Sequence, residues 1–293
     1  MRVVASILWL FLWVAVEARA ERLHWDWIQG DVYDVSLTSN TDIKVTSGDQ
    51  QLHYRNSVVV LGRWTVTEVN AGNIARLRWH VQRIQIKSGQ GDKQLTVDTE
   101  LASKTEAERS LLATLRPLLD QRFELLVNDS ARLLSVKELK RDSAGERPQR
   151  APLGESQLQV PKLFDAAGVT QAFTHLFVEF PAGDLQVGTS WKKQPQFRQP
   201  QSDGETTYQY VGNENGSHRI RVSGNVLFPN SEAMSIEVKR QQVAGSLLVK
   251  QQPAYISHVA VNLQLETETD DRGTKVNVIQ SDSEKIEVKK LLP

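Results

Sequence analysis

The sequence predicts a mainly β fold with a minor helical part. We expect long, curved antiparallel sheets that form one or two incomplete barrels, with two short helical connections. Three observations predict this class: alternating apolar and polar residues dominate the chain, turn-forming residues separate the alternating runs, and one run changes its apolar phase halfway. Alternation with a period of two is typical of strands that have one dry face and one wet face.

The clearest alternating run covers residues 257–267. Val259, Val261 and Leu263 share one parity, and Asn262, Gln264 and Glu266 share the other. Asp-Asp-Arg-Gly at residues 270–273 is a typical turn sequence, and the alternation resumes after it. This part of the chain therefore predicts a long antiparallel hairpin.

A second predicted hairpin lies within residues 62–87, with Asn-Ala-Gly-Asn at 70–73 as its turn. Its second strand begins with Leu77 and Trp79 on one parity, and its later apolar residues lie on the other parity. One extra residue in a strand moves every later side chain to the opposite face, and a β-bulge absorbs that residue. We therefore predict a bulge at about residues 82–83 in a long, curved strand.

Two segments have helical patterns. Thr105 and Glu108 form a capping-box start, apolar residues follow at helical spacing, and Pro117 should end or kink this helix. The second segment, residues 161–177, is apolar at helical spacing but contains a glycine and β-branched residues. These segments are the two predicted helical connections.

The chain divides into four predicted parts. Residues 1–20 form a signal peptide, and residues 21–140 form an N-terminal antiparallel β unit. Residues 141–160 form a charged linker rich in Pro and Gly, and residues 161–293 form a C-terminal helix plus antiparallel β unit. Residues 206–228 resemble the first hairpin, and this likeness is compatible with a true repeat or with convergence. The sequence also leaves open whether the two halves share one core.

The signal-peptide prediction depends on three features. Arg2 supplies a positive start, residues 3–16 are uncharged and apolar, and Ala18 and Ala20 occupy the small-residue positions of a cleavage site. Fourteen apolar residues are short for a membrane span, although an uncleaved anchor is the alternative. The expected location is the periplasm or extracellular cell envelope of a bacterium, reached by Sec export, with no stable membrane span after cleavage.

Composition excludes several partners and chemistries. Removing residues 1–20 takes two arginines and one glutamate from 35 basic and 35 acidic residues, which leaves a net charge of −1. A near-neutral chain has no electrostatic reason to bind nucleic acid. Cysteine is absent, so neither a disulfide nor a thiol contributes to stability or chemistry.

No motif for catalysis, cofactor binding or metal binding occurs, so we predict no catalytic residue, no cofactor and no metal ligand. The basic residues of one predicted strand could form a solvated face or an anion site. They are Arg76, Arg78, Arg83 and Lys87. The histidines show no metal-ligand spacing; they are His24, His53, His80, His175, His218 and His258.

One set of apolar residues is predicted to form either a core face or the face for an apolar ligand. It consists of Trp64, Val66, Leu77, Trp79, Val81, Val259, Val261 and Leu263. The predicted function is a non-catalytic binding or scaffold module whose partner is a hydrophobic small molecule or an envelope protein. One alternative is a carrier of a lipid or other hydrophobic ligand in a half-barrel cavity. Another alternative is a hydrolase without a recognisable motif.

Several segments, taken in order, resemble an uncharacterised secreted family of planctomycete-type bacteria that is described as a domain of unknown function. The resemblance spans most of the chain after residue 20, and it implies export and a mainly β fold but no reaction, cofactor or catalytic residue. The chain departs from the family pattern at GTSW, where an acidic residue often precedes the Ser-Trp pair, and in its charged insert at 141–157. The matching segments are LHWDWIQGDVYDVSL, GRWTVTEVNAGNIARLRWHVQRIQIK, LLATLRPLLDQRFELLVNDSARLLSVKEL, FPAGDLQVGTSWKKQPQF, ETTYQYVGNENG and QLETET.

Overall fold

The mainly β fold is confirmed by a computed structural model, which describes residues 22–91, 93–139, 165–193, 205–225, 236–271 and 273–291. Twelve antiparallel strands form one open sheet. The predicted signal peptide (1–20) and linker (141–160) lie outside the described residues. The strands are β1 (Val32–Ser47), β2 (Gln50–Val69), β3 (Ala75–Gln90), β4 (Lys93–Asp98), β5 (Arg122–Val127), β6 (Leu133–Leu139), β7 (Ser190–Lys193), β8 (Glu205–Glu214), β9 (Ser217–Asn225), β10 (Ile236–Gln251), β11 (Ala254–Asp271) and β12 (Thr274–Lys290).

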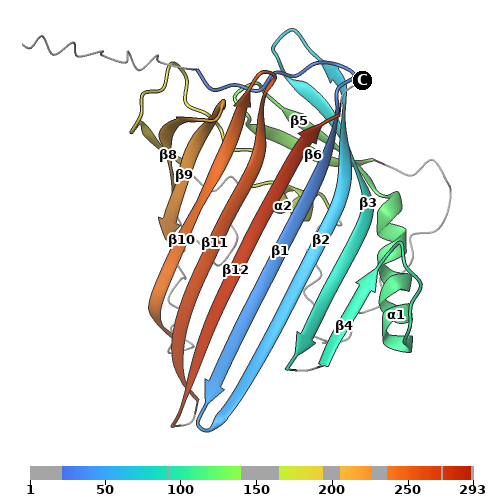
Figure 1. The fold of residues 1–293 in the computed structure, drawn as a ribbon, viewed down its shortest axis with the longest axis vertical. Coiled ribbons are helices and arrows are strands. Elements are labelled where there is room, and N and C mark those ends of the chain that lie inside the picture. Colours follow the sequence, from blue (N-terminus) through green and yellow to red (C-terminus); the bar gives the residue numbers. More distant parts are fainter. Residues whose placement is uncertain are drawn as a thin grey trace, which may run out of the picture.

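The strands follow one another across the sheet in a simple order. From one edge to the other this order is β7 to β12, then β1, β2, β3, β5 and β6, while β4 pairs with the far end of β3. Strands β1 and β12 therefore lie side by side in the middle of the sheet (Figure 1). Both halves of the chain therefore belong to the same sheet.

The predicted bulge is confirmed in β3. Gly62 of β2 lies opposite Val81, whereas the preceding Leu61 lies opposite Arg83, so Gln82 is the extra residue. Trp79 before the bulge and Ile84 after it are both fully buried, because the bulge returns the later apolar residues to the same face of the sheet.

The predicted strand at 257–267 lies within the longer β11, which pairs with β12 as expected. The sequence did not predict β1 as a strand, and it did not predict the first part of β2, before residue 62. These segments extend the hairpins far beyond their apolar parts. Six strands of 16 to 20 residues result, and they run side by side in Figure 1.

Both helical segments contain helices. Helix α1 (Glu106–Leu115) begins with the predicted capping box, in which the Thr105 side chain accepts from the Glu108 backbone N–H and the Glu108 side chain accepts from the Thr105 backbone N–H. Pro117 lies in the 3₁₀ helix η1 (Arg116–Asp120), which ends α1 as expected. Helix α2 (Ala166–Ala172) is shorter than the predicted segment, whose residues 161–164 lie outside the described part of the chain.

The core lies on one face of the sheet, which we call the inward face. Helix α2 lies behind the sheet in Figure 1, on this face, whereas α1 lies beside β4. The rings of Trp64, Trp79, Phe173 and Phe177 pack together with centroid distances of 5.0–6.0 Å. These contacts fix α2 and the turn after it against β2 and β3.

A segment before β1, residues 22–31, forms a strap across the inward face. The backbone N–H of Trp25 donates to the backbone carbonyl of Asp129 in the β5–β6 turn at 2.7 Å. The next residue, Asp26, exchanges hydrogen bonds with Ala254 at the start of β11, at 2.7 and 2.8 Å. Trp25 also stacks on Trp27 at 4.3 Å between ring centroids. The strap thus connects the two halves of the sheet, and their buried residues form one hydrophobic core.

Candidate functional site

The inward face has two parts that differ in packing. Near the strap and α2 it is a closed core of aromatic and branched side chains. Farther along the long strands, the same face loses its buried pattern after Leu37 in β1 and before Ile286 in β12. We call this second part the distal face. It is the part of the inward face on which side chains remain available for a ligand.

The eight predicted face residues all point to the inward side, because the strand register places them opposite one another. Leu263 is half-buried and lies where the distal face begins. The other seven are at most 5% exposed and belong to the closed core. Those seven are Trp64, Val66, Leu77, Trp79, Val81, Val259 and Val261.

The distal face has polar side chains next to Glu284, among them Thr41 and Asp282, and apolar side chains farther along the strands. Val45 of β1 lies opposite Leu52 of β2 and Val278 of β12, so three neighbouring strands form one apolar patch. Leu52 is 52% exposed. Contiguous apolar surface of this kind in a folded chain commonly marks a site of interaction. The apolar members of this face are Ile236, Val238, Val243, Leu263, Leu265, Ile43, Val45, Leu52, Val276 and Val278.

Glu284 lies at the junction between the closed core and the distal face. It is two residues from buried Ile286 on β12, and its cross-strand partners are Ser39 and Val261. The Oε1 atom is shielded from solvent and has no hydrogen-bond partner among the described residues. Burial raises the pKa of Glu284 to about 8, so its carboxyl group is largely protonated near neutral pH and can donate a hydrogen bond.

Tyr208 of β8 faces the same junction from another part of the sheet. Burial raises the pKa of Tyr208, and the charge of nearby Glu284 raises it further. Three strands separate β8 from β12 in the sheet. Because this effect requires the two side chains to be near each other, the sheet curls toward its inward face between β8 and β12.

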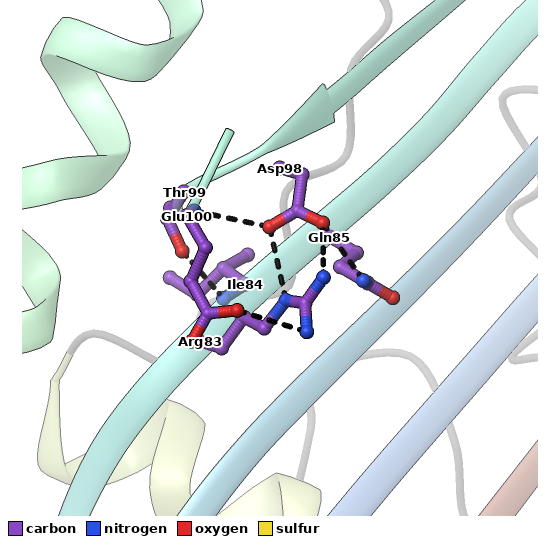
Figure 2. Close-up of polar contacts among 6 residues, drawn as sticks. All are labelled: Arg83, Ile84, Gln85, Asp98, Thr99 and Glu100. Carbon is purple, nitrogen blue, oxygen red and sulfur yellow. Dashed lines mark hydrogen bonds and ion pairs between the residues drawn. The ribbon is translucent and has the colours of Figure 1, made fainter. Parts of the chain in front are cut away.

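An ion-pair network fixes the bulged part of β3 to the end of β4 (Figure 2). Arg83 binds both carboxylate oxygens of Asp98, with Nε–Oδ1 at 3.0 Å and Nη2–Oδ2 at 2.5 Å, and its Nη1 lies 2.9 Å from Glu100. Gln85 also donates to Asp98, at 2.9 Å. The Arg83 guanidinium holds the pKa of Asp98 at about 2, although partial burial opposes this effect. The network is therefore a structural clamp on the bend of β3.

Carboxylates occupy two of the four members of the predicted basic stripe. Arg83 is held by the clamp just described, and Arg76 contacts Glu68 at 3.0 Å and Glu124 at 2.9 Å. Arg78 and Lys87 are exposed and have no ion-pair partner in the described chain. The stripe therefore does not act as a unit, and Lys87 is the available member that lies beside the distal parts of the long strands.

No group of three or more potential metal-ligating side chains occurs within the described ranges. His24 lies 2.9 Å from Asp26 in the strap, and His53 lies 2.8 Å from Asp42 between β1 and β2. Neither pair is accompanied by a recognisable nucleophile motif. Likewise, no helix in the described segments has the length and apolarity needed to cross a membrane.

Sequence reasoning missed Glu284 and the distal face. In the sequence, Glu284 occurs in a polar stretch, SDSEK, in which both parities carry polar residues. Its parity with Ile286 and Val288 was the available signal, since side chains two residues apart share a face. The cross-strand neighbours and the curl of the sheet, which make this glutamate buried, are not visible in the sequence.

The fold resembles that of solved structures with very different sequences. A structure describing lipid–protein interactions in lipovitellin matches with a TM-score of 0.52 and 11% identity, covering 90% of this chain and 25% of lipovitellin. This chain thus spans about a quarter of the length of that protein, and the likeness concerns the fold alone. An outer membrane channel from Pseudomonas putida F1 matches with a TM-score of 0.22 and 7% identity, over 90% of this chain and 97% of that chain, which is too low to indicate a shared fold.

No curated protein matches this chain. The model of a protein family, described as the family of unknown function DUF6263, matches residues 72–282. This range runs from the β2–β3 turn into β12 and contains most of the sheet. The chain therefore belongs to the family of unknown function DUF6263.

Proposed function

We propose that this protein is a non-catalytic binding protein of the bacterial cell envelope, and that the distal face holds the acyl chain of a lipid. One observation carries this proposal: a patch of half-exposed apolar side chains lies on the same face as a shielded carboxyl group that has no partner among the described residues, with Gln280 and Asp282 between them. An amphipathic molecule with one polar group and a long apolar tail matches this arrangement.

The dimensions agree with such a ligand. Glu284 and Val276 are eight residue steps apart on β12, which corresponds to about 26 Å at a rise of about 3.3 Å per residue. This length accommodates an extended acyl chain. At the inner end, protonated Glu284 can donate a hydrogen bond to an ester or carboxyl oxygen, which would satisfy its buried group.

The fold likeness to lipovitellin supports the same proposal, since that structure describes lipid–protein interactions. The predicted export agrees with this proposal, because an apolar ligand needs a carrier outside the membrane. A scaffold that binds an envelope protein would use the same exposed apolar side chains. The two functions therefore differ in the occupant of the distal face and can be separated by identifying it.

The test combines native mass spectrometry with a matched pair of variants. Protein purified from its own host should carry copurified lipid, and the fluorescent fatty acid parinaric acid should bind to the delipidated protein. Val45→Asp places a charge on the distal face, and we expect it to weaken parinaric acid binding at least tenfold. Thr46→Asp adds the same charge on the opposite face of the same strand and should leave binding unchanged.

Equal binding of parinaric acid by both variants would contradict the assigned face. A stoichiometric protein partner without lipid in the native mass spectrum would favour the scaffold function. Circular dichroism of each variant shows whether the sheet is retained, so that a loss of binding is not confused with unfolding.

A further inference from the structure

The opposite face of the sheet, which we call the outward face, contains a groove with a volume of about 410 Å³. It crosses β4, β3, β2, β1, β12 and β11. Five interstrand spacings of about 4.8 Å give it a length of about 24 Å. The groove lies on the face that Figure 1 presents to the viewer, away from α2 and the closed core.

Hydrogen-bonding side chains line this groove. Gln94, Asn262 and Gln264 present primary amides, and their side chains bond to no other part of the chain that the structure describes. Serine hydroxyls lie between them. A primary amide offers both a donor and an acceptor in one plane, which matches neighbouring hydroxyl groups of a sugar ring.

The carboxylates of the groove already have donors. Asp42 accepts from His53 at 2.8 Å and from Arg55 Nε at 3.2 Å, and these hydrogen bonds lower the pKa of Asp42 although partial burial opposes them. Asp282 accepts from the Gln280 side chain at 2.7 Å, and both share the parity of Glu284, which is that of the inward face. Arg55 therefore compensates the charge of Asp42, whereas Asp282 keeps its charge but has its side chain on the inward side of β12.

Two cationic side chains, Arg55 and Lys87, lie on the outward face in the groove. The Arg55 side chain is 73% exposed and contacts Asp42 through Nε, which leaves its terminal N–H groups directed elsewhere. Lys87 lies diagonally across from Arg55 on β3 and has no ion pair within the described residues. These two cations can therefore contact an anionic group of a ligand.

We infer that the outward groove binds an acidic glycan, with its amides on the sugar hydroxyls and with Lys87 and Arg55 on a carboxylate. The groove is long and open at the surface, as an extended oligosaccharide requires. This site and the distal face lie on opposite faces of the same strands.

Isothermal titration calorimetry of the full chain with tetragalacturonate, an acidic tetrasaccharide, tests this inference. Neutral chitotetraose is the comparison ligand. We expect tetragalacturonate to bind more tightly than chitotetraose, and Lys87→Gln to weaken tetragalacturonate binding about tenfold. Gln264→Ala should weaken the binding of both sugars. Lys289→Gln removes the same charge from the outward face outside the groove and should change neither.

Absence of binding by the wild-type protein to both sugars would overturn the inference. Equal effects of Lys87→Gln and Lys289→Gln would also overturn it, since they would show attraction to net charge alone. Equal affinity for the acidic and neutral sugars would contradict the assigned role of Lys87 and Arg55. Thermal unfolding of each variant provides the check on folding.

Discussion

Replacing Asp98 by Asn tests the clamp on the bulge of β3. The pKa of Asp98 falls from an ordinary 3.8 to about 2, and one pKa unit corresponds to about 1.4 kcal/mol. The side chain of Asp98 is only 8% exposed, so little of this energy is lost to solvent screening. Asp98→Asn should therefore lower the free energy of unfolding by about 2 kcal/mol at pH 7.

The effect has a defined pH dependence. Because the pKa of Asp98 is lower in the folded state, its contribution is present above pH 3.8 and is lost as the pH falls toward 2. The difference between wild type and Asp98→Asn should narrow from about 2 kcal/mol at pH 7 to less than about 1 kcal/mol at pH 2.5. Urea unfolding followed by tryptophan fluorescence measures both values.

Asp34→Asn is the matched control. Asp34 contacts Arg63 at 2.9 Å, but both side chains are more than 40% exposed, so this variant should cost less than about 1 kcal/mol. An Asp98→Asn variant as mild as Asp34→Asn would refute the reasoning. A difference from wild type that is equally large at pH 7 and pH 2.5 would also refute it, since the lost stability would then not come from the carboxylate charge.

Three further predictions concern stability. Gly62→Ala should cost about 2–3 kcal/mol in urea unfolding, because the new Cβ would lie 2.2 Å from the Trp79 ring; a neutral result would contradict the tight contact. Glu284→Gln should stabilise the protein at pH 9 by roughly 1–3 kcal/mol and have little effect at pH 5, since the raised pKa means that stability is lost as the pH rises from about 4.5 through 8; thermal unfolding at both pH values checks the sign. Thr105→Ala should cost about 1 kcal/mol through loss of the capping box with Glu108, and Thr105→Ser should restore most of it.

The sequence predicted the parts of the fold that have one dry face. Strands with strict alternation, such as the one containing Val259 and Val261, were found. The bulge was found as well, because a phase change of apolar residues within one strand requires an extra residue to keep them buried. The capping box at Thr105 was recognisable because its residues are close together in the chain. In each case the signal was local.

There is a physical reason why the sequence did not predict the distal parts of the long strands. After Leu37, β1 continues as Thr-Ser-Asn-Thr-Asp, so both faces carry polar residues and the period of two disappears. Such segments stay in the sheet because the neighbouring strands pair with them along their whole length. Pairing between distant segments leaves no trace in local composition. The ion pair of Arg83 with Asp98 and the burial of Glu284 also depend on such pairing, so the sequence could not predict them.

The position of β1 next to β12 has a consequence for biosynthesis. Tyr33 pairs with Lys290, so the central seam joins segments that are 257 positions apart in the chain. Until β12 emerges from the ribosome, one long side of β1 has unpaired N–H and C=O groups, which is the kind of edge on which chains aggregate. Polar residues such as Asn40 and Asp42 on β1 disfavour pairing of this exposed edge with other chains until β12 is available. A circular permutant that starts before α2, ends after β6 and joins the natural termini would make β12 and β1 neighbours in the chain, and we expect it to fold faster than the natural order.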